Sequence, residues 1–251
     1  MARALGDAPA GARLFAEAER LRKRFEAAFW CDDLSTYALA LDGEKRQCRV
    51  IASNAGHALW TGIAERRRAE RVAATLLGVG CFSGWGIRTV SRSAARFNPI
   101  SYHNGSVWPH DNALIALGLA RYGLHDEVQR VFSGLFRAAS HWEPRRLPEL
   151  FCGFSRRSGA PTQYPVACSP QAWASAGVLA LLQASLGLRF DHAAGALRFD
   201  KPMLPPFLDQ LHLRQMRLGD ASVDVMLHRF GGEVAATVTE RRGDLRVVIT
   251  H

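Results

Sequence analysis

Apolar residues recur with the spacing of an α-helix through the first three quarters of the chain. A first helix is indicated by Leu14 and Leu21, which share one face and are separated by charged residues. The same periodicity predicts further helices over residues 66–77, 109–122, 128–139 and 172–186. Pro109 is a favourable first helical residue, because proline lacks the N–H that would have no partner there. Ser169 and Pro170 predict the start of the last helix for the same reason.

The pattern changes after residue 188. Apolar and polar residues then alternate with a period of two, which is typical of strands with one buried face. The alternating stretches are residues 196–199, 211–218, 222–228, 233–239 and 244–250, with glycine-containing turns between them. The chain is therefore predicted to have a helical part over residues 1–188 and a small antiparallel β region over residues 189–251.

A long segment between the second and third helical stretches is rich in glycine and serine. It covers residues 78–98, carries Trp85 and Arg88, and has the length of a functional loop. Earlier in the chain, Asp42 and Gly43 indicate a short hairpin or turn.

Consecutive helices in pairs suggest an α/α hairpin toroid. Twelve helices of about 11–12 residues each would not fit in the helical part. We therefore expect a mainly α protein, a partial (α/α) six-hairpin toroid of about half, followed by a small antiparallel β segment.

Composition and charge exclude several classes of protein. With 48% hydrophobic and 22% charged residues, the 251-residue chain has the composition of a globular protein. No apolar run approaches the roughly 20 residues needed to cross a membrane, and the N-terminus lacks the apolar region of a secretory signal, so a cytoplasmic location is expected. The net charge is +9, but the arginines are dispersed, which favours solvated faces over a nucleic-acid partner. Five cysteines without a Cys-x-x-Cys pair argue against disulfides and a zinc site, and no cofactor is expected.

Two short segments carry the candidate chemistry. Residues 102–112 read Tyr-His-Asn-Gly-Ser-Val-Trp-Pro-His-Asp-Asn, and residues 147–153 read Leu-Pro-Glu-Leu-Phe-Cys-Gly. The first offers aromatic rings and a dense set of hydrogen-bonding groups, and the second places Glu149 between apolar neighbours. Rings on which a sugar stacks, beside an acid or base, are typical of a sugar-binding cleft. Hydrolysis of a glycosidic bond usually needs two carboxylates, and the sequence offers Glu149 as the one convincing candidate.

These segments resemble the C-terminal region of bacterial amylo-α-1,6-glucosidases, which are glycoside hydrolases of the glycogen-debranching type. The resemblance is carried by residues 83–89, 98–112, 148–153 and 164–173, and residues 54–60 resemble an earlier signature of the same proteins. The motifs occur in the same order and cover nearly the whole chain. Members of that family are much longer and carry an N-terminal β-rich domain and the first half of the toroid.

The resemblance implies an inverting hydrolase that acts on α-linked glucose, with an α-glucan or oligosaccharide as substrate. Glu149 would be the general base, which activates the water. The general acid of such enzymes is an aspartate upstream of every segment matched here. The chain is therefore expected to carry the base but not the acid, and to be inactive unless a partner chain supplies the missing N-terminal half. The choice between an α-1,6 and an α-1,4 linkage stays open.

Each remaining candidate has a structural alternative. Trp85 and Trp108 are either stacking platforms or core aromatics. Asp111 either stabilises the first turn of its helix or binds sugar hydroxyls, and a role as catalytic acid is a third possibility. Arg88 holds a carboxylate of the cleft or forms a structural ion pair. The complete set predicted to bind substrate is Trp85, Arg88, Tyr102, His103, Asn104, Trp108, His110, Asp111, Gln171 and Trp173.

The histidines and the last helix also allow two interpretations. His103 and His110 are interpreted as hydrogen-bond donors to sugar hydroxyls or to Glu149 rather than as metal ligands, because no carboxylates or thiolates complete a metal site. Gln171 and Trp173 begin a helix whose N-terminus either faces the cleft or is packed. The pair Asp32 and Asp33 is interpreted as a turn and not as a general acid.

A hypothesis from a different class is a non-catalytic module that binds α-glucans through the same aromatic residues, or a subunit completed by a partner chain. The two hypotheses differ in the role of Glu149, because only an enzyme needs its carboxylate for hydrolysis.

Overall fold

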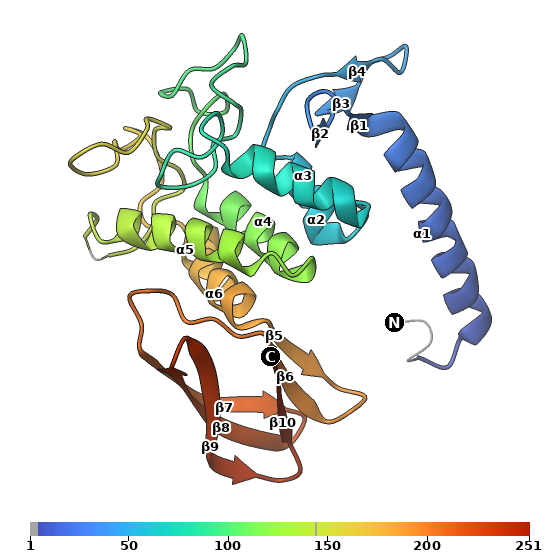
Figure 1. Cartoon of the computed structure of the whole chain (residues 1–251), viewed down its shortest axis with the longest axis vertical. Helices are drawn as coiled ribbons and strands as arrows, with labels where there is room; N and C mark the ends of the chain where they lie inside the picture. The colour runs from blue at the N-terminus through green and yellow to red at the C-terminus, as the bar shows by residue number, and fades with distance from the viewer. Residues whose placement is uncertain (1–4, 144) are drawn as a thin grey trace.

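The computed structural model describes residues 5–143 and 145–251, which form six helices and ten strands (Figure 1). The helices are α1 (Ala8–Phe29), α2 (Ala55–Thr61), α3 (Arg66–Leu77), α4 (Pro109–Arg121), α5 (His125–Ala139) and α6 (Ala172–Leu186). The strands are β1 (Trp30–Cys31), β2 (Thr36–Tyr37), β3 (Ala40–Leu41), β4 (Gln47–Cys48), β5 (Leu188–Asp191), β6 (Ala196–Asp200), β7 (Gln210–Leu218), β8 (Ala221–Phe230), β9 (Glu233–Arg242) and β10 (Arg246–Thr250).

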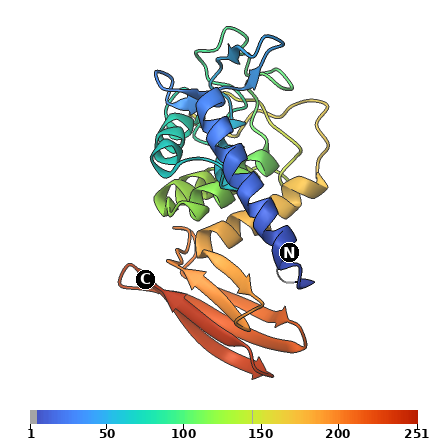
Figure 2. The same cartoon turned by 90° about the vertical axis from the view of Figure 1, so that its right-hand side faces the viewer.

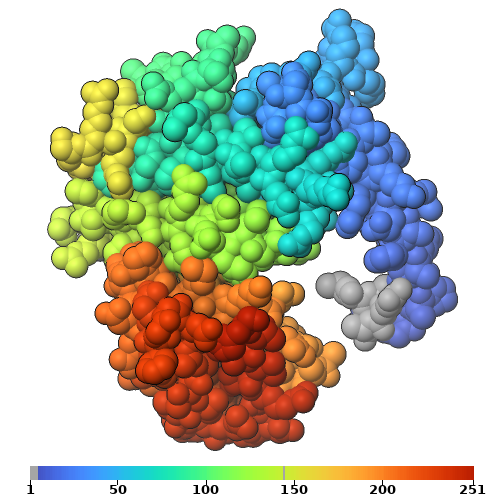
Figure 3. Space-filling view, in the orientation of Figure 1, coloured from blue at the N-terminus to red at the C-terminus, as the bar shows by residue number. Residues whose placement is uncertain are grey.

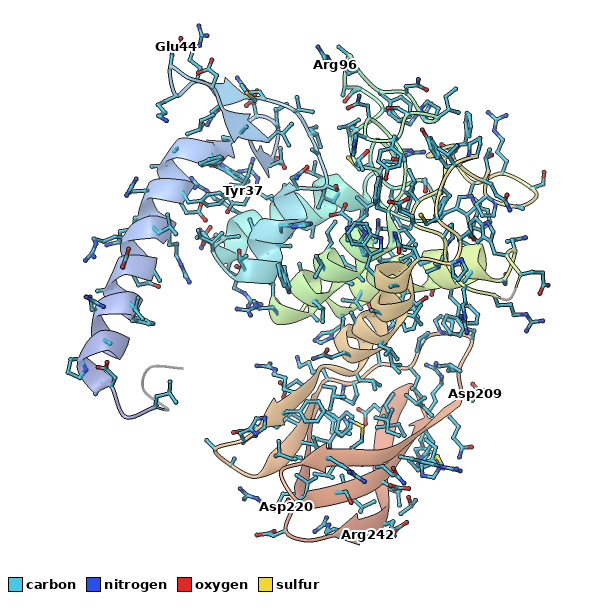
Figure 4. All side chains as sticks on the ribbon, turned by 180° about the vertical axis from the view of Figure 1, so that it is seen from behind. Tyr37, Glu44, Arg96, Asp209, Asp220 and Arg242 are labelled. Carbon is cyan, nitrogen blue, oxygen red and sulfur yellow. The ribbon has the colours of Figure 1, made fainter. Side chains whose placement is uncertain are left out.

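The first helix lies along one side of the molecule and approaches the other helices only near its C-terminal end (Figures 1 and 2). Tyr37 of β2 lies between α1 and the remaining helices (Figure 4). Its ring packs 4.8 Å from that of Phe25, and its hydroxyl donates a hydrogen bond to Glu26 at 2.8 Å. Further along α1 the apolar face is open, with Leu14 52% and Leu21 54% exposed. The helix is therefore held by its last turns.

Helices α2, α4, α5 and α6 pack around α4, which contacts the other three, and α3 packs on α2. Small residues allow the closest approach of two of these helices. A Cβ atom on Gly118 of α4 would lie 2.6 Å from the backbone nitrogen of Trp60 in α2. Ile115 and Leu119 of α4 are fully buried in this core. Glycine at position 118 thus lets α2 and α4 touch along their backbones.

The C-terminal strands form two three-stranded sheets with their own core. One sheet has the order β7-β8-β9 and is antiparallel, and the other has the order β10-β6-β5. Phe199, Val225 and Leu245 are fully buried in the core that these strands form. Leu182 of α6 packs against both this core and the helical one. Figure 3 shows the strands as the orange-to-red part of the surface, below the helices.

Two long irregular segments, residues 78–108 and 140–171, lie against each other through single backbone bridges. Arg88 pairs with Val107, Val107 pairs with Phe151, and Phe151 pairs with Gln163, all antiparallel. The segments therefore form a narrow strip of β-like pairing with few regular turns. This strip determines where Trp108 and Glu149 lie, because each is one or two residues from a paired position.

The expectation of a mainly α protein is wrong. Among the described residues 35% are helical and 24% lie in strands, which form four small sheets. The difference has a physical origin in two places. The irregular segments over residues 78–108 and 140–171 occupy chain that a toroid would use for helices, and short strands pair between α1 and α2. The β region is also not wholly antiparallel, since β10 runs parallel to β6.

Individual elements agree more closely with the sequence. The helices over residues 66–77, 109–122 and 128–139 are confirmed, as is the hairpin at Asp42-Gly43, where β3 pairs with β4. The last helix starts at Ala172 with Gln171 as its N-cap, and not at Ser169-Pro170, because Gln171 is still extended (φ −120°, ψ 136°). Strand β5 was not predicted. None of the described helices is long and apolar enough to cross a membrane.

The contact between the two irregular segments gives a direct test. A Cβ atom on Gly153 would lie 1.6 Å from the carbonyl oxygen of Gly105, so Gly153→Ala forces the segments apart. We expect a loss of about 3 kcal/mol in the free energy of unfolding, measured by urea denaturation. Gly43→Ala is the control, because no atom lies within 4 Å of its added methyl. Equal stability of the two variants would contradict the described packing.

Candidate functional site

A cavity of about 520 Å³ opens where the irregular segments meet the N-terminal ends of three helices. Asn54 is the N-cap residue of α2, His110 and Asp111 belong to the first turn of α4, and Trp173 belongs to the first turn of α6. The ends of α2, α4 and α6 therefore meet in one place, and the partial positive charge of a helix N-terminus favours acidic groups there. The cavity is lined by Leu39, Ala52, Ser53, Asn54, Thr89, Val90, Tyr102, His103, Asn104, Trp108, His110, Asp111, Glu149 and Trp173.

Glu149 lies in this cavity with 9% of its surface exposed. The hydroxyl of Tyr102 donates a hydrogen bond to its Oε1 at 2.7 Å, and the backbone N–H of Cys168 approaches its Oε2 at 3.4 Å. The hydrogen bond to Glu149 raises the pKa of Tyr102, so the phenol stays protonated as a donor. Leu150 and Phe151 beside it are fully buried. The carboxylate is thus held in place between an apolar wall and a neutral donor.

Aromatic rings form one wall of the cavity. The ring of His110 stacks on Trp173 with centroids 4.1 Å apart, and His103 lies parallel to Trp108 at 6.0 Å. Tyr102 meets Trp108 edge-on at 5.0 Å. Trp173 is 46% exposed while Trp108 is buried. Trp173 is therefore the ring that a sugar reaches from solvent, and the other rings support it.

Asp111 has a partner that lies outside the lining of the cavity. The Nε2 atom of His57, in α2, lies 2.6 Å from Asp111 Oδ1. The side chains of His57 and Asp111 are 38% and 14% exposed. This hydrogen bond is the largest cause of a raised pKa for His57, and burial acts against it. The pair joins α2 to α4 at the rim of the cavity.

His110 has the opposite environment. Burial is the main cause that lowers its pKa, so the imidazole is neutral at pH 7. Its Nδ1 atom is buried and has no hydrogen-bond partner in the described part of the chain. A neutral ring against Trp173 serves as an apolar surface and keeps one nitrogen available for a ligand.

The cavity brings together the predicted base and most of the ten predicted substrate-binding residues. Trp85, Arg88 and Gln171 do not line it. Trp85 is buried under the guanidinium of Arg156. Gln171 caps α6. The predicted residues that do line the cavity are Glu149 and seven of the substrate-binding candidates: Tyr102, His103, Asn104, Trp108, His110, Asp111 and Trp173.

Arg88 fulfils neither of the two roles considered for it. Its guanidinium forms no ion pair among the described residues, and donates instead to the carbonyl of Gly153 at 2.5 Å and to the hydroxyl of Ser155 at 2.9 Å. Burial lowers its pKa to about 10. Arg88 therefore holds the irregular segments together from behind the cavity.

The sequence did not identify His57 as part of the site. The same holds for Ser53, Asn54 and Thr89, which line the cavity. The signal for His57 was its place in residues 54–60, but the pattern of one helix does not show which residue of another it will meet.

The pair Asp32 and Asp33 lies in a turn as predicted. Asp32 pairs with Arg71 at 2.7 Å, and neither aspartate lines the cavity. The interpretation of this pair as a turn is confirmed.

A larger cavity of about 770 Å³ lies at the opposite ends of the same helices, where Arg121 ends α4 and Gly187 caps α6. The one carboxylate side chain in its lining, Asp200, is paired with Arg189 at 2.5 Å. It therefore offers no free side-chain carboxylate. Within residues 5–143 and 145–251, no three His, Cys, Asp or Glu side chains cluster as a metal site.

The two histidines provide a test by pH titration. We expect NMR to give a pKa above 6.5 for His57 and below 6.5 for His110. Asp111→Asn should lower the pKa of His57, because burial then acts without its hydrogen-bond partner. The raised pKa means that the contribution of His57 to stability is complete below pH 6.5 and is lost as the pH rises through the folded-state value.

The control for this titration is Asp220→Asn, since Asp220 is exposed in the β region far from α2 (Figure 4). It should leave both values unchanged. A pKa of His57 at or below 6.5 in the unsubstituted chain would contradict the contact with Asp111.

Several solved structures resemble this fold. A sialidase has a TM-score of 0.70 at 13% identity, over 94% of this chain and 23% of its own. A GH78 family rhamnosidase from Bacillus sp. GL1 has 0.68 at 16%, over 99% and 24%. The GH63 mannosylglycerate hydrolase from Thermus thermophilus, in complex with Tris and D-glycerate, has 0.50 at 20%, over 62% and 35%. These likenesses show the fold alone. This chain covers between 23% and 35% of the length of these proteins.

No curated protein sequence matches the chain. Its N-terminal and central part, residues 1–155, matches the mannosylglycerate hydrolase MGH1-like glycoside hydrolase domain. The expected glycoside hydrolase is thus confirmed, while the narrower amylo-α-1,6-glucosidase assignment is not shown by this match. Because the match covers more than half of the 251 residues, the chain belongs to the MGH1-like glycoside hydrolase family.

Proposed function

We propose that this chain carries the general base and part of the substrate cleft of an inverting hydrolase that acts on α-linked glucose, as the resemblance to amylo-α-1,6-glucosidases implies. The observation that carries the proposal is the environment of Glu149. Its carboxylate lies in a cavity walled by aromatic rings and accepts a hydrogen bond from the hydroxyl of Tyr102 at 2.7 Å. A carboxylate has about four lone-pair positions, so a water molecule has room to bind beside the two groups that hold Glu149.

The chemistry follows from this arrangement. In an inverting hydrolase one carboxylate removes a proton from water while an acid on the opposite face protonates the leaving oxygen. Glu149 takes the first role. Tyr102 is a neutral donor, and it fixes the orientation of the carboxylate without adding positive charge to it. The rings of Trp173 and His110 provide a surface for the sugar ring.

The charge of the lining supports a neutral substrate. Asp111 and Glu149 both line the cavity, and no arginine or lysine does so among the described residues. An anionic substrate would face two carboxylates without a cationic partner, which is unfavourable in a partly buried site. A neutral α-glucan therefore fits this cavity better than an acidic glycoside such as a mannosylglycerate.

The general acid comes, in this proposal, from a segment outside the given residues. The second carboxylate of the cavity, Asp111, is hydrogen-bonded to His57 and is not placed as a free acid. Hydrolysis then needs the upstream part of a longer protein or a partner chain. The alternative is a non-catalytic module or subunit that binds α-glucans through the same aromatic wall, and the role of Glu149 separates the two.

Glu149→Gln is the variant that tests the base. The chain alone should bind a branched α-glucan limit dextrin and release no glucose. Glucose release restored by a complementing N-terminal half should fall by about 10²–10⁴-fold in Glu149→Gln. Binding should change by no more than about fivefold, since one hydrogen bond contributes about 1 kcal/mol.

The control is Glu143→Gln, which removes an exposed carboxylate earlier in the same irregular segment and should leave both measurements unchanged. Glucose release by the chain alone that disappears in Glu149→Gln would show that an acid is present among these residues. Restored release that survives Glu149→Gln would exclude Glu149 as the base, and absence of dextrin binding would refute the cleft itself.

A further inference from the structure

The second carboxylate of the cavity is held differently from the first. Asp111 lines the cavity, and its Oδ1 lies 2.6 Å from Nε2 of His57, which comes from behind the lining. The other oxygen, Oδ2, has no hydrogen bond to any of the described residues. One oxygen is thus anchored to the protein, and the second is available for a ligand.

The position of His57 is suited to anchoring Asp111. It lies in α2, and α2 packs closely on α4 because Gly56 and Gly118 leave no side chain between them. A Cβ atom on Gly56 would lie 2.5 Å from Ile115 of α4. The backbone of α2 is therefore fixed against α4, and His57 reaches Asp111 from a rigid support.

The protonation of the pair agrees with this geometry. The titratable groups of α4 beside His57 are Asp111 and His110, and the hydrogen bond with Asp111 raises the pKa of His57. An imidazole that carries its proton on Nε2 donates to the carboxylate. A carboxylate that faces a donor of this kind accepts hydrogen bonds at its remaining positions and is poorly placed to give up a proton.

The neighbours of Asp111 define what it can accept from. Trp173 is exposed and stacks on His110, the residue next to Asp111 in α4. Asn54 and Asn104 line the same cavity and offer amide donors and acceptors. A pyranose stacked on Trp173 presents its hydroxyl groups at the ring edge, where these polar side chains lie.

We propose that His57 is a positioning residue that holds the carboxylate of Asp111 as the hydrogen-bond acceptor for a hydroxyl group of a neutral pyranose stacked on Trp173. Asp111 then selects and orients the sugar and does not donate the catalytic proton. This inference rests on the proposed function for the sugar, but it does not depend on Glu149 acting as the base.

A double-mutant cycle on the full chain tests the proposal, with maltotriose as the probe and its dissociation constant measured by calorimetry. Asp111→Asn removes the anionic acceptor and should weaken binding by about 10–100-fold, as expected for a hydrogen bond to a charged group. His57→Phe keeps a ring and removes the donor, and should weaken binding by about 3–10-fold. In the Asp111→Asn background, His57→Phe should cause no further loss.

Two further variants distinguish positioning from a general structural role. His57→Gln restores an N–H donor and should recover most of the affinity lost in His57→Phe. His192→Gln, at an exposed histidine of the β region, is the control and should bind as the unsubstituted chain does. Thermal unfolding of each variant establishes that the differences arise in folded protein.

The outcomes are distinct. Additive losses in the double variant, or unchanged binding in Asp111→Asn, would overturn this inference while leaving the proposed function intact. Non-additive losses together with hydrolysis that survives Glu149→Gln would support it and refute only the base. Absence of maltotriose binding by the unsubstituted chain would overturn both.

Discussion

The buried guanidinium of Arg88 is the interaction on which the site depends. It is fully buried and has no carboxylate partner among the described residues. Removing a charge from water without compensation is costly, and here the compensation is a set of oxygen atoms. Two of them belong to Gly153 and Ser155, and a third, at 3.4 Å, belongs to Gly80. Because these oxygens come from two irregular segments, the cost of an unpaired guanidinium enforces their contact. The bridges from Arg88 to Val107 and on to Phe151 follow from it.

This constraint explains how loops can carry a site that needs fixed geometry. Trp108 follows a bridged residue and is also the N-cap of α4, and Glu149 lies two residues before another bridge. One side of the cavity is therefore anchored in the irregular segments. The other side is anchored in α2, α4 and α6, whose N-terminal ends supply Asn54, Asp111 and Trp173. Neither half forms the cavity alone, and the contact between Tyr102 and Glu149 links residues 47 positions apart.

Sequence patterns predicted the parts of this architecture that are local. Helical periodicity located α3, α4 and α5, and alternation located five of the six C-terminal strands. The overall class was wrong because periodicity says nothing about how much irregular chain lies between helices. The parallel pairing of β10 with β6 is similarly non-local. Most candidate residues that share the cavity belong to one segment, residues 102–111. His57 escaped prediction and Arg88 was misjudged, because their partners are set by tertiary packing.

The two carboxylates of the cavity differ in the chemistry of their partners, and this difference assigns their proposed roles. Tyr102 is a neutral donor whose phenol keeps its proton, so it orients Glu149 and leaves that carboxylate able to take a proton from water. His57 is a donor whose own pKa is raised by the contact, so it favours Asp111 as an acceptor. A base needs the first environment and a sugar-binding group needs the second. A lining without arginine or lysine among the described residues completes the argument, because a cationic neighbour at either carboxylate would remove the distinction between them.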